Sequence, residues 1–434
     1  MNKEEIAIFW FRRDLRLTDN AGLYQALISG YKVLPVFIFD ENILNRLEDK
    51  DDARVTFIHQ QITRLADELQ QLGSTMLAKY GSPDLIWKQL TTDYNIKAVY
   101  TNHDYEPYAK ERDEKLTAFF NELGIKFQTT KDHCILEKDE VTKDDGKPYV
   151  VFTPYKRKWL EKLKPEHLKA YPTEKYFQNF ITLTKLPILD LSEMGFTESK
   201  LPFPDLKYTD VLKNYGTDRD FPAKEATSKI SIHLRFGTIS IRELVSQSVG
   251  KSEVWLSELI WRDFYFSILW HFPYSATRSF RPEYDKINWR NNEDEFEAWC
   301  QGKTGYPIVD AGMRQLNETG FMHNRIRMVV ASFLTKHLLI DWRWGERYFA
   351  RKLLDFELSS NIGGWQWAAG CGVDAAPYFR IFNPYEQVKK FDKELKYIKK
   401  WVPEFADPFK YPQAIVDHKL ARERCLITYK KALS

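Results

Sequence analysis

Short apolar runs alternate with helix-length amphipathic segments throughout the first 130 residues of this chain. The runs that have the character of strands are residues 6–11, 33–39, 75–79, 97–102 and 126–130. Strands separated by helices are joined by right-handed crossovers, so they pair in parallel with helices on both faces of the sheet. The alternation predicts a doubly wound, Rossmann-like α/β fold with a five-stranded parallel sheet, in which ligands bind at the carboxyl ends of the strands.

The segment after the first predicted strand lacks a glycine-rich turn. It reads FRRDLRLTDN over residues 11–20, where a dinucleotide-binding fold would carry GxGxxG. An NAD-dependent dehydrogenase is therefore disfavoured.

Beyond residue 130 the pattern of the sequence changes. Residues 131–200 are punctuated by Lys and Pro, as in a linker, and strand signals nearly vanish after them. Amphipathic helices then follow one another, for example at residues 256–270, 325–339 and 344–356. We expect an α/β domain over residues 1–130, a linker over 131–200 and an all-helical domain over 201–434.

Composition excludes several classes of protein. Lys and Arg number 64 against 61 Asp and Glu, so the net charge of +3 does not by itself indicate a polyanionic partner. The four cysteines form no CxxC or Cys/His cluster, which disfavours a metal site or a disulfide framework and fits a reducing cytoplasm. No apolar run reaches the roughly 18 residues that a membrane span needs, and no signal peptide is apparent. We expect a soluble cytoplasmic protein without a bound metal.

Four segments of the helical half carry candidate chemistry. A turn over residues 215–221 and 227–231 combines hydroxyls and backbone amides that suit phosphates, although Thr and Ser before a helix are more often plain caps. Helical spacing places Glu258, Trp261, Arg262 and Tyr265 on one face. The alternative is a partly exposed helix whose Trp261 packs in the core and whose Glu258 pairs with Arg262 at i, i+4.

The third segment, residues 322–328, puts Asn324, Arg327 and Met328 on one helical face. The alternative is that Met328 only fills space in the core. The strongest local signal is residues 354–384, which are rich in Gly, acidic residues and Trp. Glycines at 363, 364, 370 and 372 carry an entropic cost that close approach of a ligand or another backbone explains.

Five motifs resemble those of the photolyase/cryptochrome family, in the family's order along almost the whole chain. They are WFRRDLRL at residues 10–17, ELIWR at 258–262, GKTGYPIVD at 302–310, NRIRM at 324–328 and GGWQWAA at 363–369. The resemblance is strongest to enzymes of class I that repair cyclobutane pyrimidine dimers. It implies an antenna-type α/β domain and a helical domain that binds FAD and DNA.

The resemblance implies roles for individual residues. The FAD-binding positions are Tyr215, Thr227, Ser228, Lys229, Ile230, Ser231, Trp255, Arg327, Asp355, Phe356, Glu357 and Asn361. Asn361 matches the residue beside flavin N5, where plant-type photoreceptors carry Asp, and this favours repair. Arg327 would pair with Asp355, and we hypothesise that its charge stabilises reduced anionic flavin.

In the family, an extruded dimer binds beside the flavin. Trp261 and Trp367 match its aromatic walls, Glu258 and Asn324 match groups that hydrogen-bond the pyrimidine edges, and Met328 contacts the dimer where (6-4) photoproduct enzymes differ. Positions that match DNA contacts are Arg219, Glu258, Trp261, Arg262, Asn324, Arg325 and Gln387. Trp365, Trp342 and Trp289 match the electron-relay chain of the family.

Two positions depart from the family pattern. Tyr108-Ala109 stands where folate-binding members have Asn-Glu, so folate is disfavoured as antenna, and a deazaflavin, FMN or no antenna is left open. Ile362 replaces a common Asn between Asn361 and the glycine pair.

The resemblance implies a monomeric enzyme that uses light and reduced FAD to split cyclobutane pyrimidine dimers in UV-damaged DNA, without a membrane or an obligate protein partner. A blue-light photoreceptor of the cryptochrome type and a flavoprotein that prefers single-stranded DNA are the alternatives. A flavoprotein with dark redox chemistry is disfavoured by the absence of a dinucleotide fingerprint.

Overall fold

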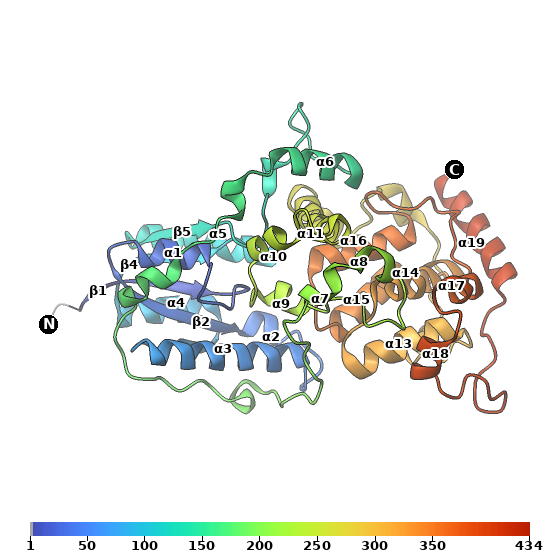
Figure 1. The fold of residues 1–434 in the computed structure, drawn as a ribbon, viewed down its shortest axis with the longest axis horizontal. Coiled ribbons are helices and arrows are strands. Elements are labelled where there is room, and N and C mark those ends of the chain that lie inside the picture. Colours follow the sequence, from blue (N-terminus) through green and yellow to red (C-terminus); the bar gives the residue numbers. More distant parts are fainter. Residues whose placement is uncertain (1–2) are drawn as a thin grey trace. The chain divides into compact units, whose positions relative to one another are not determined.

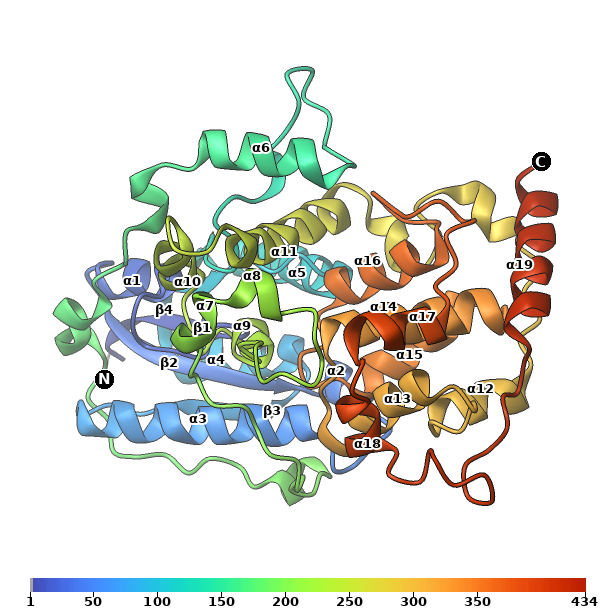
Figure 2. The same ribbon diagram turned by 45° about the vertical axis from the view of Figure 1, so that its right-hand side comes forward.

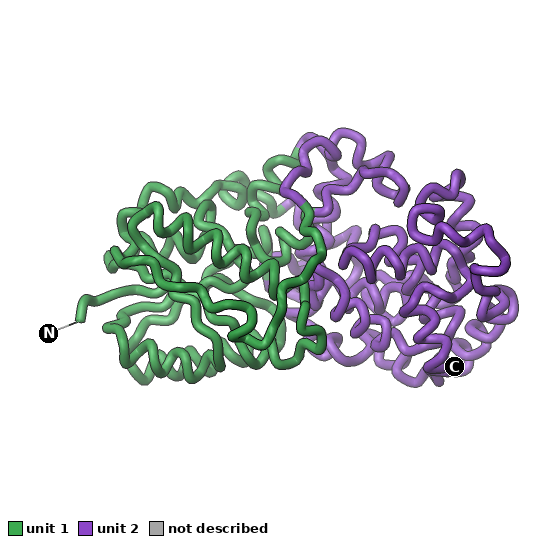
Figure 3. The backbone as a smooth tube through the Cα atoms, turned by 90° about the horizontal axis from the view of Figure 1, so that it is seen from below, with its two compact units in different colours: residues 1–137, 162–204, 230–249 green, residues 138–161, 205–229, 250–434 purple. Residues whose placement is uncertain are grey.

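The computed structural model describes residues 3–434 and divides them into two compact units, each made of three chain segments (Figure 3). Unit 1 contains the described residues through Glu137 together with Lys162–Pro204 and Ile230–Val249. Unit 2 contains Lys138–Glu161, Asp205–Lys229 and Gly250–Ser434. The units therefore differ from the single boundaries expected near residues 130 and 200, because part of that linker belongs to unit 2 and two later helices belong to unit 1.

Unit 1 is built on a five-stranded parallel sheet, which confirms the predicted topology. Its strands are β1 (Glu5–Phe11), β2 (Lys32–Asp40), β3 (Leu77–Gly81), β4 (Asn95–Asn102) and β5 (Lys126–Thr130), in the order β3-β2-β1-β4-β5. β3 begins later than expected, and the start of β2 pairs instead with Phe180, which forms a parallel bridge with Val33.

Helices cover both faces of this sheet. The helices of unit 1 are α1 (Ala21–Leu27), α2 (Glu41–Leu44), α3 (Ala53–Gln71), α4 (Pro83–Asp93), α5 (Pro107–Glu122), α9 (Ser231–Phe236) and α10 (Ile241–Ser248). Side chains of α4 and α5 form one core with Ile6, Ile8 and Trp10 of β1. On the other face α1 comes so close that a Cβ at Gly22 would lie 2.9 Å from the Phe9 ring.

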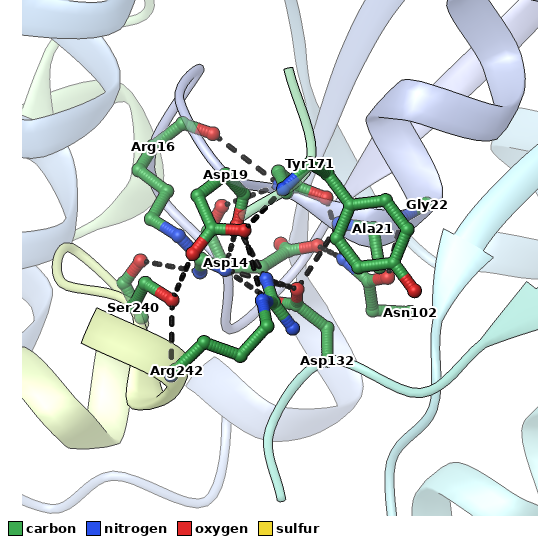
Figure 4. A network of polar contacts seen from close by, with 12 residues as sticks. Asp14, Arg16, Asp19, Ala21, Gly22, Asn102, Asp132, Tyr171, Ser240 and Arg242 are labelled. Carbon is green, nitrogen blue, oxygen red and sulfur yellow. Dashed lines mark hydrogen bonds and ion pairs between the residues drawn. The ribbon is translucent and has the colours of Figure 1, made fainter. Parts of the chain in front are cut away.

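A buried polar network holds the loop after β1 at the carboxyl end of the sheet (Figure 4). Asp132, just beyond β5, accepts hydrogen bonds of 2.7 Å from both Arg16 and Arg242. Burial by itself raises the pKa of Asp132, and the two guanidiniums outweigh it and lower that pKa. Arg242 also donates to Asp19 at 2.8 Å, which ties α10 into unit 1. The chain's own side chains thus fill part of the edge where a ligand was expected.

The regular elements of unit 2 are helices. They are α6 (Phe152–Lys162), α7 (Thr209–Leu212), α8 (Tyr215–Asp218), α11 (Glu253–His271), α12 (Glu293–Cys300), α13 (Pro307–Thr319), α14 (Asn324–Ser332), α15 (Trp342–Lys352), α16 (Leu358–Ala369), α17 (Pro384–Phe391), α18 (Lys396–Trp401) and α19 (His418–Leu433). The helix expected over residues 325–339 is α14 followed by a π-helical turn, Phe333–His337. The helix expected over residues 344–356 ends earlier, because Leu353 is extended.

Glycines allow the central helices of unit 2 to approach closely. A Cβ at Gly345 of α15 would lie 2.1 Å from the ring of Trp365 on α16, and one at Gly363 of α16 would lie 2.2 Å from the ring of Tyr265 on α11. No real Cβ tolerates such distances, so these glycines are required by packing. None of the helices described for residues 3–434 combines the length and apolar character that crossing a lipid bilayer requires.

Candidate functional site

Side chains of α11, α14, α15 and α16 surround a cavity of about 370 Å³ in unit 2. Many of the site residues expected from the sequence line this cavity. They are Arg219, Glu258, Trp261, Asn324, Arg327, Met328, Asp355, Phe356, Glu357, Asn361, Trp365 and Trp367. The positions matched to a lesion and those matched to a flavin therefore share one cavity. Six further residues line it: Tyr265, Ala331, Phe349, Leu353, Ser360 and Gly364. The sequence had placed Tyr265 on the same helical face as Glu258 and had singled out Gly364 for close approach, whereas the other four were not expected.

Glu258 and Arg219 form an ion pair at this cavity. Glu258 projects from α11, whose N-terminus is capped by the Ser252 hydroxyl, and its Oε1 accepts a hydrogen bond from Arg219 beside α8. The Arg219 guanidinium also lies 5.4 Å from the centre of the Tyr215 ring. Burial raises the pKa of the Glu258 carboxyl, and the charge of Arg219 opposes that rise. Tyr215 thus lies behind this pair and not in the cavity lining.

The start of α14 sets the direction of three cavity side chains. The ring Nδ1 of His323 caps the helix by accepting a hydrogen bond of 3.1 Å from the Arg325 N–H. Asn324, Arg327 and Met328 then face the cavity, which the predicted helical face anticipated. Arg325 is on another side, where it donates to Asp220 at 2.9 Å.

Arg327 and Asp355 form the ion pair that the resemblance implies. Nη2 of Arg327 donates to both carboxylate oxygens of Asp355 at 3.1 and 2.9 Å, and its Nε donates to the Met322 carbonyl at 2.8 Å. These contacts fix the guanidinium at the wall of the cavity. A fixed cation beside a flat ligand stabilises negative charge that develops on it.

The N-terminus of α16 orders the opposite wall. The Glu357 carboxylate caps this helix by accepting from the N–H groups of Ser359 and Ser360 at 3.3 and 2.9 Å. One turn later the Asn361 amide donates to the backbone oxygen and to Oε1 of Glu346 on α15, at 3.1 and 2.9 Å. Glu346 was missed from the sequence, since nothing distinguishes it from the other charged residues of α15.

The turn expected to hold phosphates does not line the cavity. Thr227, Ser228 and Lys229 end a segment of unit 2, whereas Ile230 and Ser231 open α9 in unit 1. The backbone of Lys229 has φ 52°, in the left-handed region. The turn therefore stays a prediction.

Three other expected residues also lie outside the cavity lining. Trp255 stacks on Tyr208 with parallel rings at 5.7 Å, and Arg262 lies 4.7 Å from the centre of the Phe266 ring. Gln387 is on α17. The roles that the resemblance implies for these three side chains therefore stay predictions.

The three tryptophans of the expected electron relay differ in burial. Trp365 and Trp342 are 2% and 1% exposed, and their indole N–H groups have no hydrogen-bond partner among residues 3–434. Trp289 is half-buried and packs edge-on against Tyr429 at 5.9 Å. A fourth indole, Trp299, lies 6.0 Å from Trp365. No feature of the local sequence distinguishes Trp299 from the other tryptophans.

The two departures from the family pattern lie away from this cavity. Ile362 lines a separate small cavity of about 20 Å³ with Tyr265 and Gln366, and not the large one. Tyr108 is in unit 1, where its hydroxyl donates to Asp40 at 2.6 Å.

The cavity residues fit an FAD isoalloxazine. The ion-paired guanidinium of Arg327, the oriented amide of Asn361 and several aromatic side chains meet there. A Cβ at Gly364 would touch nothing within 4 Å, so α16 leaves free space on that side of the cavity. A flat heterocycle with polar edges is recognised by this combination of groups. Among the residues described, no group of three or more His, Cys, Asp or Glu side chains is arranged to hold a metal.

Comparisons with known proteins agree with this chemistry. Residues 255–431 match the family model "FAD binding domain of DNA photolyase", and residues 7–174 match the model "DNA photolyase". A deoxyribodipyrimidine photo-lyase of Synechococcus sp. is 37% identical over 97% of this chain and 96% of its own.

Two solved structures are similar over nearly the whole chain. A bacterial class III photolyase from Agrobacterium tumefaciens superposes with a TM-score of 0.88 at 34% identity, covering 100% of this chain and 98% of that one. An archaeal photolyase from Sulfolobus tokodaii with two FAD molecules gives a TM-score of 0.81 at 36% identity, covering 98% and 100%. With the shared fold and the FAD-binding domain of residues 255–431, this chain belongs to the photolyase/cryptochrome family.

Proposed function

We propose that this protein is a deoxyribodipyrimidine photo-lyase, which splits cyclobutane pyrimidine dimers in DNA with blue or near-UV light. The observation that carries the proposal is the shared cavity, because residues matched to the dimer and residues matched to FAD line the same space. When bound, reduced and excited FAD supplies the electron that opens the cyclobutane ring and receives it back.

The residues of the cavity act on the dimer by binding and orienting it. Trp261 and Trp367 offer indole faces on which bases stack, a contact worth roughly 1–3 kcal/mol per base. Glu258 and Asn324 offer hydrogen-bonding groups to the pyrimidine edges, and Met328 offers an apolar contact. Photolyases in general take their target nucleotides out of the duplex before acting on them.

On the cofactor side, Arg327 holds positive charge and Asn361 holds an oriented amide. Asp355 and Glu346 keep these two groups in place through the hydrogen bonds described above. The proposal also assigns Tyr215, residues 227–231, Trp255, Phe356 and Glu357 to FAD. Trp365, Trp342 and Trp289 carry electrons that restore reduced flavin.

Arg219, Arg262, Arg325 and Gln387 contact the DNA backbone in this proposal. In the free protein Arg219 and Arg325 are ion-paired with Glu258 and Asp220, so DNA phosphates have to compete for them. Each phosphate that is neutralised releases counterions, so affinity should fall steeply with salt although the net charge is only +3.

The decisive experiment is anaerobic repair of an oligonucleotide with one thymine dimer, in blue light and in darkness, with the pigment extracted from the same preparation. We expect repair only in light and FAD in the extract. A colourless protein that cannot be loaded with FAD, or repair at equal rates in darkness, would refute the proposal.

The same measurement separates the alternatives. A blue-light receptor would change its flavin absorbance on illumination without repairing the dimer, and a dark redox flavoprotein would ignore light. A flavoprotein that prefers single strands would repair a looped-out dimer and fail on a duplex.

The remaining assignments belong to the same proposal. Residues 201–434 hold FAD and DNA, and residues 1–130 form the antenna-type domain, with a deazaflavin or flavin preferred over folate as antenna. In this proposal the protein acts on UV-damaged DNA as a monomer in the cytoplasm. Its four cysteines are all free, which is typical of proteins in a reducing compartment.

A further inference from the structure

An aromatic side chain from outside the cavity covers one face of Trp261. Phe152, the first residue of α6, stacks on the indole with ring centres 3.7 Å apart and planes 8° from parallel. Phe152 is 8% exposed and does not line the cavity, whereas Trp261 is half-buried and does. One face of this indole is thus packed against Phe152, while the side chain also borders the cavity.

Several contacts hold α6 in place against α11, and the two helices lie next to each other (Figures 1 and 2). The buried indole of Trp159 donates to Oδ2 of Asp263 at 3.0 Å, and Nζ of Lys156 donates to the hydroxyl of Ser257 at 2.6 Å. Both acceptors are on the helix that carries Trp261. The position of Phe152 is therefore fixed relative to that helix.

Further contacts limit the rotation of the Trp261 side chain. The Phe264 ring meets it nearly edge-on, at 5.5 Å and 77°, and the Tyr265 ring lies 5.4 Å away. Tyr265 is itself pressed against α16 where Gly363 has no Cβ. An indole confined in this way loses little freedom when a base stacks on it, so less of the stacking energy is spent on ordering.

We propose that Phe152 is a positioning residue for lesion binding: it holds the other face of Trp261 toward the cavity and makes α6 part of the lesion site. The inference rests on the proposed function, because it takes Trp261 to be a wall for the dimer. A stacked aromatic pair contributes a free energy that corresponds to a roughly 2- to 10-fold change in a binding constant. The effect should therefore appear in the affinity for damaged DNA.

The test compares the FAD-loaded wild type with Phe152→Leu and Phe152→Tyr. The readouts are the dissociation constants for a thymine-dimer oligonucleotide and for the same undamaged sequence, with flavin absorbance and melting temperature alongside. We expect Phe152→Leu to bind the dimer roughly 2- to 10-fold more weakly, with undamaged DNA and flavin unaffected, and Phe152→Tyr to retain wild-type affinity. Tyr155→Leu is the matched control, since Tyr155 belongs to the same helix and packs on Phe264 at 5.1 Å.

A double-mutant cycle with Trp261→Ala shows whether Phe152 acts through the indole. In that background Phe152→Leu should have no further effect on dimer binding. If Phe152→Leu does not fold, Phe152→Met, which keeps the apolar volume, serves in the same cycle.

Unchanged dimer affinity in Phe152→Leu, or an equal loss for damaged and undamaged DNA, would overturn the inference while leaving the proposed function intact. A wild type that does not prefer the dimer would overturn both.

Discussion

The side-chain amide of Asn361 donates two hydrogen bonds to a single residue, Glu346, at 3.1 Å to the backbone oxygen and 2.9 Å to Oε1. The amide oxygen is then the group that Asn361 can present to the cavity it lines. Burial raises the pKa of the Glu346 carboxyl, and the hydrogen bond from Asn361 opposes that rise. The orientation of Asn361 therefore depends on a residue of another helix.

Asn361→Asp should make the bound flavin harder to reduce. The change removes the donor and brings a second carboxyl against Glu346, and added negative charge disfavours an anionic reduced ring. We expect the two-electron midpoint potential of the flavin to fall by roughly 30 mV or more, which corresponds to a tenfold change in the equilibrium constant for its reduction. Redox titration followed by flavin absorbance measures it. Glu346→Gln keeps an acceptor for Asn361 and should shift the potential less, and equal shifts in both variants would contradict this account.

Glu258→Ala should slow repair without loss of FAD. Loss of a hydrogen bond to a charged group costs about 1.5–3 kcal/mol, so dimer binding should weaken by roughly tenfold or more. Gel-shift titration with damaged DNA and repair per absorbed photon measure the effect, and Glu258→Gln is the milder control. Equal repair by wild type and Glu258→Ala would remove this residue from the site.

Trp342→Phe should block the photoreduction of oxidised flavin and spare repair by enzyme that has been chemically reduced. Phenylalanine fills most of the buried space but is much harder to oxidise than indole. Absorbance during illumination with a reductant follows the reaction. Trp299→Phe is the control, because Trp299 also lies near Trp365, at 6.0 Å. Should only Trp299→Phe block photoreduction, the electrons take that route instead.

Substituting alanine for each of two adjacent glycines of α16 should have different effects, one on stability and one on FAD affinity. In Gly363→Ala the new Cβ would lie 2.2 Å from the Tyr265 ring, so the melting temperature of the apoprotein should fall. In Gly364→Ala the Cβ would enter free space in the cavity lining, so the fold should persist and FAD affinity should drop. Apoprotein melting and flavin titration separate the two results. Unchanged FAD affinity in Gly364→Ala would exclude this side of the cavity as the flavin site.

His323 should make the protein less stable as the pH falls below neutrality. Burial lowers its pKa from 6.5 to about 4. Between those values the unfolded chain binds a proton that the folded chain excludes, so stability is lost as the pH falls through this window. We expect a loss of about 2 kcal/mol at pH 5 relative to pH 7 from this group. Urea unfolding at both pH values checks it. His323→Asn retains a capping oxygen and should flatten the dependence, and an equal slope in both proteins would disprove the assignment.

Short apolar runs predicted the sheet, because a strand such as β1 is buried on both faces, and helical spacing predicted helices such as α15, whose buried residues fall on one face. Family motifs anticipated the Arg327–Asp355 pair, whose partners are both in matched segments. Glu346 and Phe152 could not be found in this way. Their roles arise from contacts with residues that are remote in sequence or on another helix, and no local pattern encodes those contacts. The π-helical turn after α14 was missed for the same reason, since its residues continue the helical periodicity.

The hydrogen bond from Trp159 to Asp263 spans 104 residues of sequence. During synthesis α6 therefore leaves the ribosome long before α11 exists to receive it. Until then the aromatic side chains of Phe152, Tyr155 and Trp159, all buried in the finished protein, face water. The segment of residues 138–161 therefore reaches its final packing only after α11 has been made.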